Sequence, residues 1–215
     1  AGDSSGKSTK PALKKSVSSK YRTQSVMFFD FGAGSATATI ARIAVDAKTG
    51  AATAVKVLGH AWERDIGGRA LDEVIIDRLA SDFDEQRGSQ ATPSRQLPRV
   101  MMRLRKEAQR VREILSANTE TQVAVPSLYD DTDLRTIVKR DLFESGASGI
   151  LARSVRPARA VLKRSGLSID DIDAVVPFGG ASRTPKFQEL LCSALGRPAL
   201  NKSINSDEAA VMGSA

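Results

Sequence analysis

Hydrophobic residues gather in three short segments after residue 24. Residues 25–31 form a nearly continuous apolar run, residues 36–45 are rich in small and β-branched side chains, and residues 54–62 largely alternate between apolar and polar. The turn-forming residues 46–50 separate the last two segments. Short β-branched segments joined by tight turns are typical of adjacent strands, so the pattern predicts a three-stranded antiparallel meander.

A helical period of three to four residues replaces the strand pattern from residues 67–68 onward. These two glycines precede one helix, and residues 97–116 form a second, long and basic helix with apolar residues along one face. The polar residues 85–94 between the helices include a glycine and a proline, which predicts a loop. Residues 121–128 and 134–138 then predict a β-hairpin.

The last third of the chain predicts helix, strand and helix in turn. Residues 142–164 have a helical pattern that is interrupted near Pro157, because proline removes a backbone donor. Residues 174–177 form a short apolar strand, and a helix follows over residues 184–195, with proline at a favoured early position. A last helix, capped by a serine or an aspartate, is expected over residues 206–215.

This order of elements predicts an α/β fold made of two parts. Residues 25–66 and 150–215 are expected to form one subdomain, with a mixed sheet and flanking helices. Residues 67–149, which hold two helices and the hairpin, are expected to form a subdomain inserted into the first. A chain of 215 residues is long enough to bury a hydrophobic core in such an arrangement.

Positive charge is concentrated at the start of the chain. The net charge is +7, and residues 1–24 hold six lysine and arginine residues against a single aspartate. This segment is rich in serine and threonine and poor in large apolar side chains, so it is predicted to be a disordered arm or linker. Nucleic-acid binding by the arm is not expected, because no series of aromatic residues and no known binding module accompanies the charge.

Other features exclude several classes of function. No apolar run approaches the roughly 18 residues of a membrane span. Cys192 is the only cysteine and lies in a helical apolar pattern, which predicts a buried, unreactive thiol. His60 is the only histidine, so neither a zinc site nor a catalytic triad is expected. Residues 1–8 resemble a Walker phosphate loop but lack the strand that must precede one, and Asn201 begins a match to the N-glycosylation pattern that is not expected to be occupied.

Two glycine-rich turns are the strongest candidates for a functional site. Residues 30–35 form the first and residues 179–180 lie in the second, and each turn follows a short apolar run. Glycine lets backbone N–H groups approach a polyphosphate because it has no Cβ. The carboxylate of Asp30, at the end of a strand, could bind Mg²⁺ through water. An ordinary tight turn is the alternative interpretation of each sequence.

Five segments taken together resemble one protein family. They are residues 30–35, 65–68, 105–116, 178–186 and 202–210. Their order and spacing are similar to those of the seventy-kilodalton heat-shock chaperone superfamily, and the resemblance covers about residues 25–215. It implies the actin-like ATPase fold, but only its second lobe. The first phosphate loop, the catalytic lysine and the catalytic glutamate belong to the first lobe and have no match in this chain.

Further segments resemble the large endoplasmic-reticulum members of this superfamily, the glucose-regulated 170-kilodalton chaperones. These segments are residues 84–87, 115–118 and 209–213. The resemblance implies a protein of the endoplasmic reticulum lumen that acts as nucleotide exchange factor for the lumenal seventy-kilodalton chaperone. It also implies a holdase that binds unfolded client proteins through regions outside this chain. The inserted subdomain would face the partner chaperone, and no nucleic acid or membrane is implied.

The same resemblance implies a site for ATP or ADP and Mg²⁺ in the intact two-lobed protein. Asp30 would hold Mg²⁺ through water. The phosphates would lie against Gly32, Ala33, Gly34, Ser35, Gly179 and Gly180. The remaining nucleotide-binding residues would be Gln109, Arg112, Ser116, Arg183 and Asp207, of which the first four would contact adenosine.

Two positions depart from the pattern of the ATP-hydrolysing relatives. Thr37 stands where those relatives have aspartate, which removes a carboxylate expected near Mg²⁺ and the attacking water. Glu113 stands where a cationic side chain stacks on adenine, so Arg183 would stack from one side only. We therefore expect weak nucleotide binding by this chain, no enzymatic activity of the fragment itself and at most slow hydrolysis by its parent. The alternative is an autonomous ATP-hydrolysing chaperone.

Overall fold

The computed structural model describes residues 21–201 and contains two β-sheets in this range. The strands are β1 (Tyr21–Phe31), β2 (Ser35–Asp46), β3 (Ala52–Arg64), β4 (Glu120–Tyr129), β5 (Thr132–Lys139) and β6 (Ala174–Phe178). The α-helices are α1 (Gly68–Arg87), α2 (Pro98–Ala117), α3 (Arg140–Gly146), α4 (Ser148–Ser154), α5 (Arg156–Ser165) and α6 (Pro185–Leu195). The 3₁₀ helices are η1 (Ser94–Gln96), η2 (Ile169–Asp171) and η3 (Gly180–Arg183).

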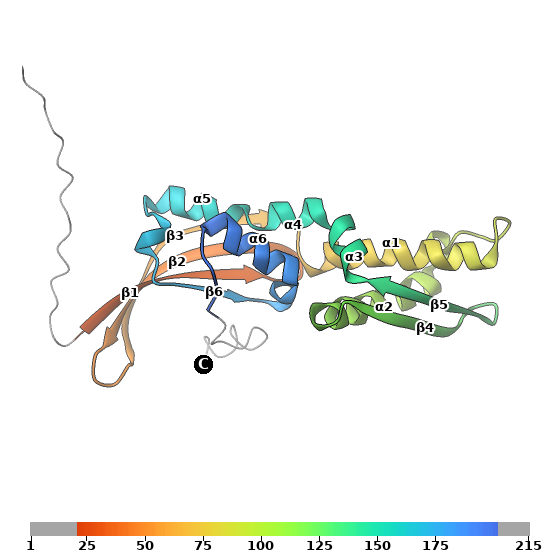
Figure 1. Ribbon diagram of the computed structural model, residues 1–215, viewed down its shortest axis with the longest axis horizontal. Helices are drawn as coiled ribbons and strands as arrows, with labels where there is room; N and C mark the ends of the chain where they lie inside the picture. The colour runs from red at the N-terminus through yellow and green to blue at the C-terminus, as the bar shows by residue number, and fades with distance from the viewer. Residues whose placement is uncertain (1–20, 202–215) are drawn as a thin grey trace, which may run out of the picture.

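The larger sheet contains the predicted meander and one additional strand. Its order is β3-β2-β1-β6, in which β1, β2 and β3 pair antiparallel and β6 pairs parallel with β1. Figure 1 shows α4, α5 and α6 along one side of this sheet. Phe29 and Phe31 of β1 are fully buried on that side, with ring centroids 5.5 and 4.6 Å from the ring of Phe187 in α6. This aromatic cluster fixes the end of β1, where the first glycine turn begins.

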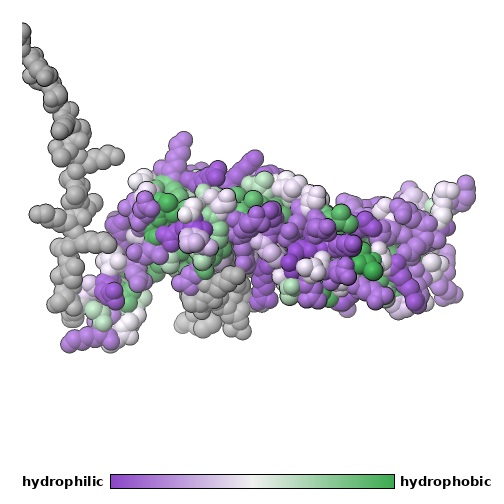
Figure 2. Space-filling model, in the orientation of Figure 1, coloured by the Kyte–Doolittle hydropathy of each residue, from purple (hydrophilic) through white to green (hydrophobic). Residues whose placement is uncertain are grey.

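The second part of the molecule is long and narrow, and it extends from one end of the large sheet (Figure 1). In it α1 and α2 pack on each other, α1 contacts β5 and α2 contacts β4. The predicted hairpin is confirmed as β4 and β5, and its turn residues Asp130 and Asp131 have positive φ angles of 45° and 54°. On the face shown in Figure 2, hydrophilic residues cover most of this part. Its apolar side chains therefore form mainly an internal core.

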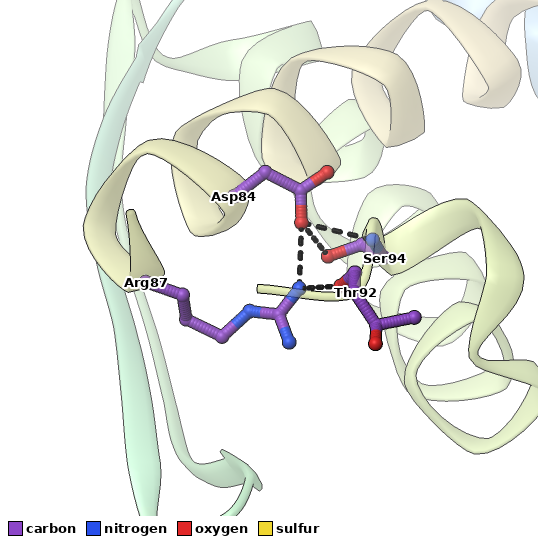
Figure 3. A network of polar contacts seen from close by, with 4 residues as sticks. All are labelled: Asp84, Arg87, Thr92 and Ser94. Carbon is purple, nitrogen blue, oxygen red and sulfur yellow. Dashed lines mark hydrogen bonds and ion pairs between the residues drawn. The ribbon is translucent and has the colours of Figure 1, made fainter. Parts of the chain in front are cut away.

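A polar network closes the loop between α1 and α2 (Figure 3). The backbone N–H and the hydroxyl of Ser94 donate to Oδ1 of Asp84 at 2.9 and 2.6 Å. Arg87 donates to the same carboxylate oxygen at 2.9 Å and also to the carbonyl of Thr92. The end of α1 is thereby fixed to the start of η1.

Two boundaries differ from the sequence-based prediction. Residues 21–24, assigned above to the disordered arm, form the beginning of β1, where Tyr21 is opposite Asp46 of β2. Their side chains are exposed, so this extension of the strand carries no hydrophobic pattern. Helix α1 continues to Arg87, although residues 85–87 were expected to belong to a loop. Backbone pairing with β2 stabilises the start of β1, and the Asp84 network stabilises the end of α1. Hydrophobic periodicity reveals neither interaction.

The interrupted helix of residues 142–164 is three helices, α3, α4 and α5. The break before Pro157 is close to the expected place, whereas the break at Ala147 was not predicted. Gly146, at the end of α3, lies so close to α1 that a Cβ there would stand 2.9 Å from Cγ1 of Val74. The first break thus occurs where the chain packs on a distant helix, which local sequence does not reveal.

Several smaller expectations can also be compared with the structure. Cys192 is partly exposed, so the prediction of a buried thiol was wrong; it lies beside the buried row of Leu191 and Leu195 rather than within it. No helix within residues 21–201 is long and apolar enough to cross a membrane. The rest of the N-terminal arm, the Walker-like residues 1–8 and the last predicted helix lie outside the described residues. The division into two subdomains stays a prediction.

Candidate functional site

The two glycine turns lie side by side. Because β1 and β6 run parallel, with Asp30 opposite Phe178, their carboxyl ends meet at the same edge of the sheet. Gly179 has a φ angle of 85°, and a Cβ at this position would lie 2.6 Å from Oδ1 of Asp30 and 2.6 Å from the carbonyl oxygen of Phe31. Only glycine fits there without a shift of the backbone. The second turn therefore approaches the first within van der Waals contact.

Asp30 lies between these turns on the face of the sheet opposite to Phe29 and Phe31, since successive side chains of a strand alternate in direction. The carboxylate is half-buried, and burial raises its pKa above the ordinary aspartate value. Its direct neighbour across the β1–β2 pair is Thr37. The position at which the ATP-hydrolysing relatives carry a second carboxylate is thus adjacent to Asp30, and here it holds a neutral hydroxyl.

Helix α1 begins directly on the first turn. The backbone N–H groups of Gly68 and Arg69 donate to the carbonyls of Gly32 and Ala33, both at 2.9 Å. Gly67 precedes them with a φ angle of 147°, and a Cβ there would lie 2.7 Å from the carbonyl oxygen of Gly32. The first turn is therefore held from two sides, by Gly179 and by the start of α1.

Arg112 connects α2 to this arrangement. Its Nε lies 2.6 Å from Oδ1 of Asp72 on α1, and both side chains are largely buried. Its guanidinium stands 3.4 Å from the place where a Cβ on Gly68 would be. Burial is the largest influence on the pKa of Asp72, and with the nearby charges of Glu113 and Glu73 it holds this pKa above the ordinary value despite Arg112. Arg112, one of the predicted adenosine contacts, therefore lies next to Gly68, whose N–H donates to the first glycine turn.

The other predicted adenosine residues are further from the turn contacts. Gln109 is exposed on α2 and donates to Glu113 at 3.1 Å, and the hydroxyl of Ser116 donates to the carbonyl of Glu113 at 2.6 Å. Both share one side of α2 with Arg112, at spacings of three and four residues. Arg183 is exposed at the end of η3, and none of the contacts described above includes it.

For the remaining predicted residues, the structure gives a position but does not test a role in binding. The first turn closes with a hydrogen bond from the N–H of Gly32 to the carbonyl of Ser35 at 3.2 Å. Gly180 begins η3, and a Cβ there would meet no atom within 4 Å. Asp207 lies outside the described residues. Within residues 21–201 no cluster of three potential metal ligands occurs.

A feature of the site that sequence reasoning missed is a cavity of about 330 Å³ beside the first turn. Its wall includes Ala33 and Gly34 from the turn and Arg69 from the first turn of α1. The sequence signal that could have shown it is the Gly67-Gly68 pair, because a helix that starts on a glycine turn places its next side chain beside that turn. Arg69 was not among the predicted site residues.

A carboxylate between two glycine turns, with the start of a helix hydrogen-bonded to one of them, is an arrangement typical of proteins that bind nucleotide phosphates. The chain belongs to the Hsp70 family, since the family model described as "Hsp70 protein" matches residues 8–215. The mixed α/β fold is consistent with the actin-like ATPase region of that family, and the family binds nucleotide.

Among curated proteins, the chain is similar to large members of this family. It is 36% identical to Heat shock 70 kDa protein 17 of Arabidopsis thaliana over 195 residues, which cover 88% of this chain and 22% of that protein. It is 36% identical over 193 residues to Hypoxia up-regulated protein 1 of Homo sapiens, and 38% identical over 192 residues to that of Gallus gallus. Each of these two alignments covers 88% of this chain and 19% of the relative.

These relatives confirm the resemblance to the glucose-regulated 170-kilodalton class. The chain spans only about a fifth of the length of the relatives it matches. The chain therefore corresponds to one region of the large Hsp70-family proteins to which it is similar.

Proposed function

We propose that this chain is the second lobe of the nucleotide-binding domain of a large chaperone of the endoplasmic reticulum lumen. The parent acts as nucleotide exchange factor for the lumenal seventy-kilodalton chaperone and holds unfolded client proteins. The observation that carries the nucleotide role is the contact between the two glycine turns around Asp30. The compartment and the partner are supported by the relatives named Hypoxia up-regulated protein 1, through the class to which they belong.

In this proposal nucleotide acts mainly as a conformational ligand. Asp30 would hold Mg²⁺ through water, and the turns at Gly32–Ser35 and Gly179–Gly180 would bind the phosphates through N–H groups. Mg²⁺ would supply positive charge that offsets the charge of the phosphates. Arg112 lies next to Gly68, and Gln109 is on the same side of α2 as Arg112. This position suits both residues to contact the sugar and the base. ATP then stabilises the closed two-lobed state that engages the partner.

Slow hydrolysis follows from the geometry of one residue pair. Thr37 is directly opposite Asp30, so the position nearest to the single carboxylate offers no second charge to hold Mg²⁺ or attract a proton from water. A hydroxyl at this place can orient water but cannot act as a general base near neutral pH.

The test of the exchange function uses the parent protein and a purified lumenal seventy-kilodalton chaperone loaded with fluorescent ADP. The release rate is measured with and without the parent, and with and without ATP. We expect an acceleration of about tenfold or more that requires ATP. Parent protein with Asp30→Asn serves as the control, because it keeps the partner surface but should lose the ATP-dependent acceleration. An unchanged release rate with wild-type parent would contradict the proposal.

The second candidate function is an autonomous ATP-hydrolysing chaperone. It is distinguished by Thr37, whose place beside Asp30 makes Thr37→Asp a direct test. In the exchange-factor proposal, this substitution raises the turnover of the parent by restoring a carboxylate. Wild-type turnover already equal to that of ordinary seventy-kilodalton chaperones would instead support the alternative.

A further inference from the structure

Arg69 lies beside the first glycine turn, and its guanidinium pairs with no carboxylate among residues 21–201. Its side chain lines the cavity next to Ala33 and Gly34. A Cβ on Gly34 would stand 2.9 Å from Nη2 of Arg69, so the guanidinium is in direct contact with the turn. Within residues 21–201, the Arg69 side chain makes no hydrogen bond and no ion pair. A guanidinium held against a phosphate-type turn without a protein partner is available to an anion.

The backbone of the same turn offers donors as well. The carbonyls of Gly32 and Ala33 are occupied by the N–H groups at the start of α1. By contrast, the N–H groups of Ala33 and Gly34 donate to no acceptor among residues 21–201. The turn therefore has its acceptors satisfied and two donors open. Open N–H groups beside a guanidinium are the chemistry that binds phosphate oxygens.

Two carboxylates line the cavity too, and their charge must be weighed. Glu73 is paired with Arg95, with 3.3 Å between Oε2 and Nη1. Asp65 and Arg69 are both exposed to solvent, so salt screens both charges. Arg69 has no such partner and is the cation in contact with the turn itself. The cavity therefore combines the guanidinium of Arg69, at the turn, with the carboxylates of Asp65 and Glu73 further along its wall.

We propose that Arg69 is a phosphate-binding residue whose guanidinium neutralises part of the charge of a nucleoside polyphosphate, so that binding depends less on Mg²⁺. This inference rests on the proposed nucleotide site and assigns a new residue to it. It agrees with the small supply of metal ligands, because Asp30 has Thr37 rather than a carboxylate as its neighbour. A guanidinium beside the turn would take over part of the role that a metal ion has when two carboxylates hold it.

The experiment titrates the 215-residue chain with ATP and with adenosine by calorimetry, each with Mg²⁺ and with EDTA. Arg69→Ala should weaken ATP binding about tenfold in EDTA, since a charge-assisted contact is lost, and less than that in Mg²⁺. Adenosine binding should not change, because adenosine has no phosphate. Arg69→Lys should restore part of the affinity. Arg156→Ala, which removes an equal charge at an exposed position of α5, is the matched control.

The outcomes separate this inference from the proposed function. If the wild-type chain binds ATP and Arg69→Ala binds it equally well in EDTA, Arg69 has no phosphate role and the inference is overturned. An equal loss of ATP and adenosine binding overturns it as well, because the effect would then be structural. Melting temperatures of the variants, expected to match the wild type, exclude misfolding. Failure of the parent to release ADP from its partner would contradict the exchange function without affecting the role of Arg69.

Discussion

At the scale of single residues, the contact between the turns depends on the absence of one side chain. Gly179→Ala would place a methyl group against Asp30 and the backbone of Phe31 at a positive φ angle. We expect this change to lower the free energy of unfolding by about 1–3 kcal/mol. Gly180→Ala is the matched control, because a Cβ there meets open space. Urea unfolding compares the two, and equal midpoints would mean that the turns can separate at little cost.

The half-buried carboxylate of Asp30 should reduce the stability of the folded chain near neutral pH. Burial raises its pKa in the folded state, so the folded chain disfavours the ionised form. Its contribution to stability is present below the ordinary pKa of 3.8 and is lost as the pH rises through the raised value. Asp30→Asn should therefore increase the free energy of unfolding at pH 7 and change it little near pH 3. Urea unfolding at both pH values checks this, and a loss of stability at pH 7 would contradict it.

At the scale of secondary-structure elements, hydrophobic periodicity predicted most of the fold, whereas the surroundings of the glycine turns depend on how distant segments meet. The meander, the hairpin and the long helices follow from local patterns of two or three to four residues. The break at Ala147 and the exposed start of β1 do not, because they depend on contacts with distant segments. For the same reason the glycine turns could be chosen from the sequence, whereas Arg69 becomes a candidate only when α1 is seen to start on the turn.

The hydrogen bonds to Asp84 stabilise the C-terminal end of helix α1. Burial alone would raise the pKa of Asp84, but hydrogen bonds from Ser94 and Arg87 outweigh it, and the pKa lies below the ordinary value. Asp84→Asn should thus cost about 1–2 kcal/mol near pH 7. The difference should shrink as the pH falls through the lowered pKa, since the wild type loses the same charge.

Its control is Asp77→Asn, which removes an exposed carboxylate of the same helix that pairs with Arg95. Surface ion pairs contribute little, so this variant should unfold close to the wild type at each pH. Thermal unfolding from pH 3 to pH 7 measures both. If the two variants behaved alike, the network in Figure 3 would not be what stabilises the end of α1.

At the scale of the whole molecule, the proposed function makes this chain one side of a nucleotide site. The residues proposed to bind phosphate come from two turns of one sheet edge and from α1, and a lobe outside this chain would supply the rest. We therefore expect the chain alone to bind ADP about tenfold or more weakly than its parent, because fewer contacts offset the cost of association. Calorimetry on both proteins measures the ratio, and equal affinities would show that the second lobe binds nucleotide by itself.

The connection between α1 and the first turn also has a mechanical consequence. Helices α1 and α2 have 20 residues each, which corresponds to a length of about 30 Å. The pair starts at the backbone bonds to Gly32 and Ala33, and its far end is stiffened around Asp84. A rotation of about 10° at the near end displaces the far end by roughly 5 Å over this length. Because α1 is attached to the first glycine turn, a small rotation there would produce a larger displacement at the far end of the helix pair.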